Sequence, residues 1–222
     1  MAQDDNPKNI VQSVAKVFAV LRTFDAALPE LTISEVAARA DLKMLARPLL
    51  AELAPDLVDA ASLGMLDDTD VVYVERVQKD MKINLDRRTG SRTGAYGAAL
   101  GHAILAFLPV EKAEDILRRS NRVRLSERTL TDLDELMNRL ALVRKRGYAV
   151  SDGENAYGLR TIAAPVLGSD GEPVAGVSAT ITVDRMSLDD FVSIVAPRVQ
   201  AIAAELSSAV RLTFGSVAQA RM

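Results

Sequence analysis

Two apolar segments, residues 160–167 and 173–183, flank the turn sequence GSDG. Glycine and aspartate in such a short connection favour a tight turn, so we expect the two segments to pair as a β-hairpin. Residues 63–66 and 71–74 form a second pair of this kind around an acidic turn, and residues 82–85 are a candidate for a further strand. Strands joined by short turns pair antiparallel, which restricts the fold to classes that contain an antiparallel sheet.

Helical periodicity is present near the N-terminus. Apolar residues recur at three- and four-residue steps over residues 10–25, which predicts an amphipathic helix. Thr32 or Ser34 can cap a short second helix over residues 34–40, and residues 40–42 then read as a tight turn.

Further helices are predicted between and after the hairpins. Residues 98–108 are apolar and follow a glycine-rich stretch, and Pro109 can start another helix. The clearest helix begins at Asp132 and ends at Gly147, and a last helix runs from about Ser187 past Arg211, interrupted or kinked near its proline. Because helices do not alternate strictly with strands, we predict an α+β fold with a largely antiparallel sheet flanked by helices.

The composition excludes several classes of function. The 222-residue chain carries 27 Lys and Arg against 30 Asp and Glu, so it lacks the field of a protein that binds nucleic acid by charge alone. It has no cysteine and one histidine, which removes most zinc and catalytic-triad chemistry. No secretory signal or membrane-length apolar stretch is present, so we expect a cytoplasmic protein without metal, cofactor or membrane anchor.

Five segments resemble the IclR (isocitrate lyase regulator) family of bacterial transcription factors. They are VQSVAKVFAVLRTFDA (11–26), LTISEVAARADL (31–42), TDVVYVERV (69–77), GAYGAALGHAILAFLP (94–109) and GYAVSDGENAYGLRTIAAPV (147–166). The resemblance implies a winged helix-turn-helix, a linker helix and an effector domain with a GAF- or profilin-like sheet. The surroundings of Tyr96 and residues 185–188 resemble the branch that controls protocatechuate and p-hydroxybenzoate catabolism.

The chain departs from the family pattern after residues 31–42. In the family, a recognition helix, a wing and a linker helix precede the effector domain, whereas here residues 44–50 already resemble its opening. We therefore predict a truncated helix-turn-helix, a winged-helix remnant, over residues 1–43 and an effector domain over residues 44–222. The remnant has five basic and six acidic side chains, so its electrostatic attraction to DNA is small. Its candidate DNA-binding residues are Ser34, Arg39 and Lys43.

Three explanations of this departure stay open. The gap is a natural internal deletion, an artefact of how the gene was delimited, or a replacement in which residues 44–54 enter the DNA groove themselves. The third is the least favoured, because Pro48 and a leucine-rich face suit packing better than base contact.

The resemblance also implies a pocket for a small acidic metabolite between the sheet and the glycine-rich loop. The positions carried over are Tyr96, Ala98, Leu100, Ser151, Asp152, Glu154, Thr161, Ser178 and Thr180. Independently, Ser178 and Thr180 share one face of a strand, and glycines in the loop let a backbone approach a ligand. These glycines can equally serve turns and packing, the two hydroxyls can face solvent, and Asp152 and Glu154 would repel an anion and so can orient the loop instead.

Two basic runs, residues 76–92 and 118–128, are most simply solvated faces. If the metabolite is an aromatic or dicarboxylic acid, Arg92 is the nearest candidate partner in the sequence, because guanidinium suits bidentate recognition of carboxylates. His102 has no companion at metal-ligand spacing, so we expect a surface residue or one satisfied by local hydrogen bonds.

The leading prediction is a ligand-responsive regulator of aromatic carbon-source catabolism with an intact effector domain and an incomplete DNA-binding domain. Its expected partners are a small acidic metabolite, operator DNA in intact relatives, and further copies in a homodimer or tetramer. The alternative is a stand-alone effector-binding and oligomerisation protein that modulates full-length relatives. An enzyme is not predicted, since the chain has no Gly-x-Ser-x-Gly elbow, no Walker loop and no second histidine.

Overall fold

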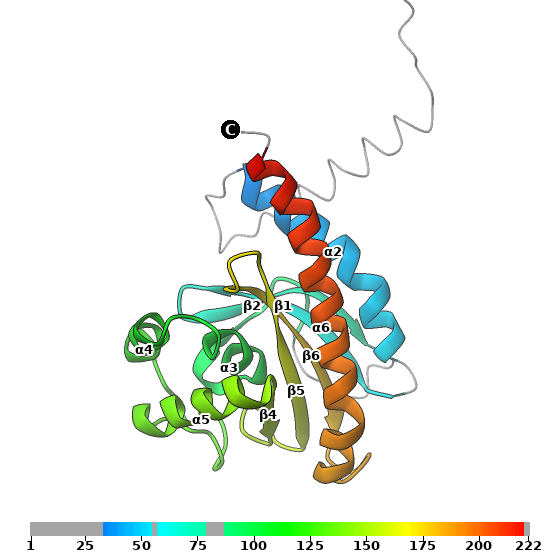
Figure 1. The fold of residues 1–222 in the computed structure, drawn as a ribbon. Coiled ribbons are helices and arrows are strands. Elements are labelled where there is room, and N and C mark those ends of the chain that lie inside the picture. The colour runs from blue at the N-terminus through cyan, green and yellow to red at the C-terminus, as the bar shows by residue number, and fades with distance from the viewer. Residues whose placement is uncertain (1–32, 55–56, 79–86, 220–222) are drawn as a thin grey trace, which may run out of the picture. The chain divides into compact units, whose positions relative to one another are not determined.

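The computed structural model describes residues 33–54, 57–78 and 87–219 (Figure 1). The chain divides into two units, Met1–Met44 and Leu45–Met222, and the second contains the sheet. The helix expected over residues 10–25 and the strand expected over residues 82–85 lie outside the described residues. The prediction of a domain boundary after residue 43 stays a prediction.

The first described element, α2, is one helix from Ile33 to Leu53. The predicted short helix with a turn at residues 40–42 is therefore wrong. Between Ile33 and Arg47 the sequence contains no glycine or proline and is rich in Ala, Leu and other good helix formers, so nothing local stops the helix. Pro48 lies inside α2 rather than in a first turn, and its ring is on the exposed side.

A six-stranded sheet forms the centre of the second unit. Its strands are β1 (Ala60–Asp67), β2 (Asp70–Gln78), β3 (Arg92–Gly94), β4 (Ala149–Asp152), β5 (Leu159–Leu167) and β6 (Pro173–Thr182), in the order β3-β2-β1-β6-β5-β4. Every pairing is antiparallel. Both predicted hairpins, β1–β2 and β5–β6, are confirmed, and pairing of β1 with β6 joins them into one sheet.

Three α-helices lie between β3 and β4 in the chain, and a fourth follows β6. They are α3 (Ala99–Leu105), α4 (Val110–Arg119), α5 (Leu133–Arg146) and α6 (Leu188–Gln219). The ends predicted for α5 are confirmed: the Asp132 side chain accepts a hydrogen bond from the amide of Glu135, and Gly147 ends the helix with φ of 83°. The predicted interruption of the last helix is absent, because α6 runs through Pro197.

Helices cover both faces of the sheet (Figure 1). Helix α3 contacts β5 and β6 on one face, and α6 packs on β5 and β6 from the other. Close approach of α3 depends on two paired glycines, since a Cβ at Gly176 would lie 3.0 Å from Leu100 Cδ2 and a Cβ at Gly64 3.1 Å from Leu100 Cδ1. Side chains alternate along a strand, so Ser178 and Thr180 share the face of Gly176, whereas Val177 and Ile181 are buried on the opposite face.

Candidate functional site

Polar side chains form two cross-strand rows on the face of the sheet that carries α3. Ser62 of β1 pairs with Arg76 of β2 on one side and with Ser178 of β6 on the other. In the next row, Thr180 pairs with Thr161 of β5, which pairs with Ser151 of β4. Their side chains share one face because the register aligns them directly across neighbouring strands.

A small cavity of about 20 Å³ lies over the second row, and we call it the inner cavity. Its lining residues are Tyr73, Arg76, Arg87, Ser151, Asn155, Ala156, Leu159, Thr161 and Thr180. This lining contains two arginines, several hydroxyl and amide groups, and no Asp or Glu. A volume of roughly 10–15 Å³ suffices for one water, so a metabolite can enter only if part of the lining moves.

Arg76 reaches into this face from β2. Its Nη1 donates to Ser62 Oγ at 3.0 Å and its Nε donates to Gln78 Oε1 at 3.2 Å. Its Nη2 is buried and has no hydrogen-bond acceptor among the described residues. Burial lowers the pKa of Arg76, Tyr73 opposes this shift, and the charge of Arg87 adds to it. A buried cationic donor without an acceptor is costly, so this atom marks a place for an anionic group.

Arg87 closes the inner cavity from the opposite side. Its Nη2 donates to Asn155 Oδ1 at 3.1 Å, and its guanidinium lies 5.7 Å from the centre of the Tyr73 ring. Both partners are uncharged, so the positive charge of Arg87 is not neutralised by them.

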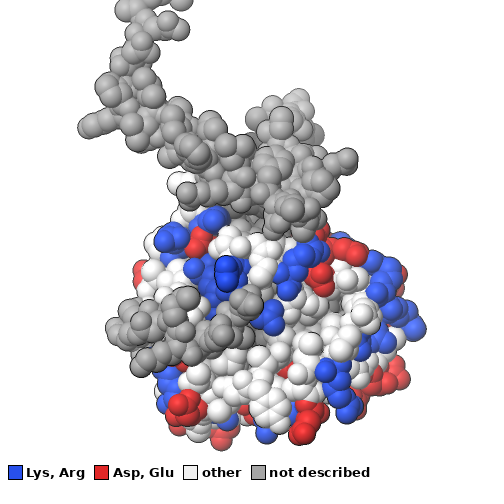
Figure 2. Space-filling model, turned by 180° about the vertical axis from the view of Figure 1, so that it is seen from behind, with Lys and Arg blue, Asp and Glu red and all other residues white. Residues whose placement is uncertain are grey.

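Several other arginines in the described ranges are paired with acidic neighbours. The ion pairs include Arg47–Glu75, Arg92–Asp67, Arg128–Asp152, Arg139–Glu154, Arg160–Asp152 and Arg185–Asp59. In Figure 2, blue and red surfaces adjoin at several places along the edge of the molecule. Arg76 and Arg87 differ from these paired arginines, because no acidic residue lines their cavity.

Three of the predicted pocket residues, Ser151, Thr161 and Thr180, line the inner cavity. The hydroxyls of Thr161 and Thr180 lie 3.0 Å apart and hydrogen-bond each other. Ser178 is buried one row further along the same face. The structure therefore brings these four hydroxyl-bearing residues together.

Tyr96, Ala98 and Leu100 are buried and line neither of the two cavities described here. The Tyr96 hydroxyl donates to the carbonyl of Val123 at 2.7 Å and accepts from its amide at 2.9 Å. Leu100 packs over the two glycines of the sheet. In this structure all three residues serve packing and loop attachment.

Asp152 and Glu154 hold the loop that follows β4. Asp152 accepts hydrogen bonds from Arg128 Nη1 and Arg160 Nε, each at 2.7 Å. Glu154 accepts from Arg139 Nη1 at 2.9 Å. Burial raises the pKa of Glu154, and the nearby Arg139 opposes this shift. These contacts agree with the alternative that the two carboxylates orient the loop.

Arg92 is committed to the β1–β2 turn. Its Nη1 donates to Asp67 Oδ2 at 2.5 Å and its Nε donates to Asp70 Oδ2 at 3.2 Å. It lines neither cavity. Arg76, the first residue of a basic run expected to be a solvated face, is instead half-buried and lines the inner cavity.

His102 is fully buried in α3 and is not at the surface. Its Nε2 lies 2.5 Å from the carbonyl oxygen of Tyr96, which accepts the ring hydrogen. Burial lowers the pKa of His102 to about 4, so the ring is neutral at pH 7. Among the described residues, no group of three or more His, Cys, Asp or Glu side chains is arranged to hold a metal ion.

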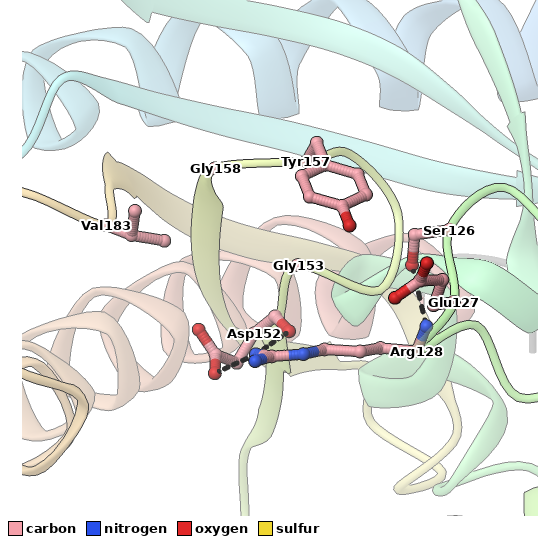
Figure 3. Close-up of a pocket in the computed structure, with 8 residues that line it drawn as sticks. All are labelled: Ser126, Glu127, Arg128, Asp152, Gly153, Tyr157, Gly158 and Val183. Atoms are coloured by element: carbon pink, nitrogen blue, oxygen red, sulfur yellow. Dashed lines mark hydrogen bonds and ion pairs between the residues drawn. The ribbon is translucent and has the colours of Figure 1, made fainter.

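A larger and more open cavity of about 270 Å³ lies on the other side of the same loop (Figure 3). Its lining residues are Ser126, Glu127, Arg128, Asp152, Gly153, Tyr157, Gly158 and Val183. In Figure 3, Arg128 extends toward Asp152 below the loop that carries Tyr157. Here Arg128 is paired with the Asp152 carboxylate, so this outer cavity would attract an anion less strongly than the inner cavity.

The candidate DNA-binding residues Ser34, Arg39 and Lys43 all lie on α2. They belong to one continuous helix. Their role stays a prediction. None of the helices in the described ranges is long and apolar enough to cross a membrane.

The comparisons with known proteins agree on one family. Residues 34–208 match the family of the bacterial transcriptional regulator IclR C-terminal domain. The chain is 30% identical over 156 residues to the HTH-type transcriptional regulator KipR of Bacillus subtilis (strain 168), covering 68% of this chain and 62% of that protein. It is 28% identical over 151 residues to the Pca regulon regulatory protein of Pseudomonas putida, covering 68% of this chain and 52% of that protein.

A solved structure shares the fold. The C-terminal domain of the Escherichia coli transcriptional regulator KdgR has a TM-score of 0.68 and is 28% identical, covering 76% of this chain and 97% of that domain. The named relatives are transcriptional regulators and not enzymes, which agrees with the prediction. The matched region spans only 62% and 52% of the two curated relatives. With a sheet of this topology and a family match over most of its length, the chain belongs to the IclR family of bacterial transcriptional regulators.

Proposed function

We propose that this chain is a ligand-responsive IclR-type transcriptional regulator whose effector domain, residues 44–222, binds a small carboxylate in the inner cavity. One observation carries the proposal: Arg76 Nη2 is buried without an acceptor in a cavity whose described lining contains no acidic residue. A carboxylate would satisfy this donor by a charge-assisted hydrogen bond.

The hydroxyl groups beside Arg76 would orient the rest of the ligand. Ser151, Thr161 and Thr180 line the cavity, and Ser178 follows in the next row. Polar groups that converge on one small cavity can fix the orientation of a ligand. In this proposal Tyr96, Ala98 and Leu100 support the site, and Asp152 and Glu154 hold its loop.

We propose further that the regulated genes serve aromatic catabolism, in the branch that handles protocatechuate and p-hydroxybenzoate. The similarity to the Pca regulon regulatory protein of Pseudomonas putida supports this assignment. An aromatic acid or a product of ring cleavage is then the expected effector.

Regulation would follow from a shift between two arrangements of a homodimer or tetramer in the cytoplasm. A ligand that binds one arrangement more tightly increases its population, and this changes how the N-terminal segments meet operator DNA. The N-terminal remnant, with Ser34, Arg39 and Lys43, contributes only part of that DNA contact.

The experiment has two parts. A thermal-shift panel of aromatic acids and their ring-cleavage products identifies a ligand by its stabilisation of the folded chain. A mobility-shift titration with DNA from the chain's own promoter, at two salt concentrations and with and without that ligand, then measures regulation. Ligand-dependent retention of the DNA is expected. A panel without any stabilising acid would refute the effector site, and DNA retention that ignores the ligand would refute the regulatory role.

A second function is favoured by one observation, the unbroken course of α2 from Ile33 to Leu53. In this proposal, α2 stands in place of the recognition helix and the wing that the resemblance implies. A chain of this kind could bind effector and form mixed oligomers with full-length relatives without reading DNA itself. Co-purification with an intact paralogue would support this function, and a strictly homomeric species would exclude it.

A further inference from the structure

The inner cavity holds two cationic side chains that reach it from different parts of the chain. Arg76 projects from β2, whereas Arg87 lies in the segment between β2 and β3. The two charges are close enough that each disfavours the other, since Arg87 helps to lower the pKa of Arg76. No carboxylate among the lining residues balances either of them.

The partners of these arginines are neutral on both sides. Arg76 donates to the hydroxyl of Ser62 and the amide oxygen of Gln78. Arg87 donates to the amide oxygen of Asn155, a residue of the loop after β4. A hydrogen bond to a neutral oxygen is weaker than one to a carboxylate, so an anionic ligand could displace the neutral acceptor of either guanidinium.

We propose that Arg76 and Arg87 form a two-cation site that selects dicarboxylates over monocarboxylates. One carboxylate binds Arg76 Nη2 at the sheet, and the second binds Arg87, which gives up Asn155 Oδ1 for it. This inference rests on the proposed function, because it names the ligand class of the same cavity.

The size of the cavity supports an exchange rather than simple filling. A space of about 20 Å³ cannot take a metabolite while Arg87 remains bonded to Asn155. Displacing Arg87 breaks one hydrogen bond, and a monocarboxylate held by Arg76 offers no charged replacement. The second carboxylate of a dicarboxylate supplies this charged replacement, so of the two ligand types only a dicarboxylate neutralises both guanidiniums.

The test uses matched pairs of ligands with the full chain. Succinate, glutarate and adipate are compared with butyrate, pentanoate and hexanoate, respectively, in isothermal titration at low and moderate salt. We expect the best dicarboxylate to bind at least roughly tenfold more tightly than its partner of equal carbon number, as a charge-assisted hydrogen bond implies. Equal affinity within every pair would overturn the proposal.

Variants separate the two arginines. Arg87→Gln should remove the preference for the dicarboxylate and should not lower the affinity for the monocarboxylate, because only the second carboxylate loses its partner. Arg76→Gln should lower the affinity for both ligands by roughly tenfold to a hundredfold. A preserved preference in Arg87→Gln would overturn the assignment of the second carboxylate.

The matched control is Arg118→Gln, which removes an exposed arginine of α4 that pairs with Glu114. It changes the net charge by the same amount and should leave both affinities unchanged. If Arg76→Gln does not fold, Arg87→Gln and Asn155→Ala still decide the question. The latter removes the competing acceptor, so dicarboxylate affinity should rise, and a fall would contradict the exchange.

The outcome is independent of the regulatory proposal. If dicarboxylates bind with the expected preference and DNA retention does not respond, the two-cation site stands and the regulatory function fails. If another metabolite controls DNA retention and the matched pairs bind equally, the regulatory function stands and the two-cation site fails.

Discussion

Arg139 of α5 donates two hydrogen bonds to the Glu154 carboxylate, at 2.9 and 3.2 Å from its Nη1 to Oε1 and Oε2. The backbone carbonyl of Glu154 also accepts from Thr129 Oγ1 at 2.6 Å. The loop after β4 is thus tied to α5 and to the segment before it. This loop contributes Asn155 and Ala156 to the inner cavity and Gly153 and Tyr157 to the outer one, so its position shapes both.

Glu154 predicts a pH dependence of stability. Burial raises its pKa in the folded chain, so the folded state holds this proton more tightly than the unfolded state does. The contribution of Glu154 to the free energy of unfolding should therefore fall as pH rises from the pKa of the unfolded chain through the higher folded pKa. Urea denaturation of the wild type and of Glu154→Gln over this range measures the difference. A difference that grows more favourable to the wild type with rising pH would contradict the prediction.

His102 predicts the opposite dependence. Its pKa is lowered to about 4, below the usual 6.5, so its contribution to stability is full above pH 6.5 and is lost as pH falls toward 4. The loss should reach up to about 3 kcal/mol at the acid end of this range. Since the chain has one histidine, the imidazole resonance in an NMR titration is unambiguous. A midpoint near 6.5, or the same acid loss in His102→Gln, would show that the ring is not buried as described.

Local signals account for what the sequence predicted well. The hairpins β1–β2 and β5–β6 and both ends of α5 follow from turn residues, a capping aspartate and a left-handed glycine, all within a few positions of their partners. Strands β3 and β4 were missed because they have only three and four residues, too few for an alternating pattern to be recognised. The turn expected at residues 40–42 was wrong because the surrounding residues are good helix formers, with no glycine or proline between Ile33 and Arg47 to stop the helix.

The candidate site was predicted only in part, for a physical reason. Ser151, Thr161 and Thr180 follow from strand alternation once the strands are known. Tyr73 and Arg76 are three residues apart, so simple alternation puts them on opposite faces of β2. A register shift at Leu63/Gly64 in the β1–β2 pairing brings both to the inner cavity. Arg92 was favoured instead because its partners Asp67 and Asp70 approach it only in the folded hairpin.

Gly176 predicts a strong steric effect in the core. In Gly176→Ala the new Cβ would lie 3.0 Å from Leu100 Cδ2 and 3.3 Å from Ile104 Cγ1, so these two side chains of α3 must move by a few tenths of an ångström. We expect a loss of about 1–3 kcal/mol in the free energy of unfolding. The control is the double variant with Leu100→Ala, in which the added methyl gains space and the two costs should be less than additive. Strict additivity in urea denaturation would argue against this contact.

Tyr96 decides between a supporting role and direct ligand contact. In Tyr96→Phe the amide and carbonyl of Val123 lose the hydroxyl that serves both, which should cost about 1–2 kcal/mol of stability. The same variant should bind carboxylates as the wild type does, because the hydroxyl is turned toward Val123 and lines neither described cavity. Thermal denaturation measures the first effect and isothermal titration at a temperature well below the transition measures the second. Thr180→Val is the companion variant, since Thr180 lines the inner cavity. This substitution should lower the affinity for the carboxylate. Unchanged stability together with reduced carboxylate affinity in Tyr96→Phe would indicate that Tyr96 contacts the effector directly, as the resemblance implies.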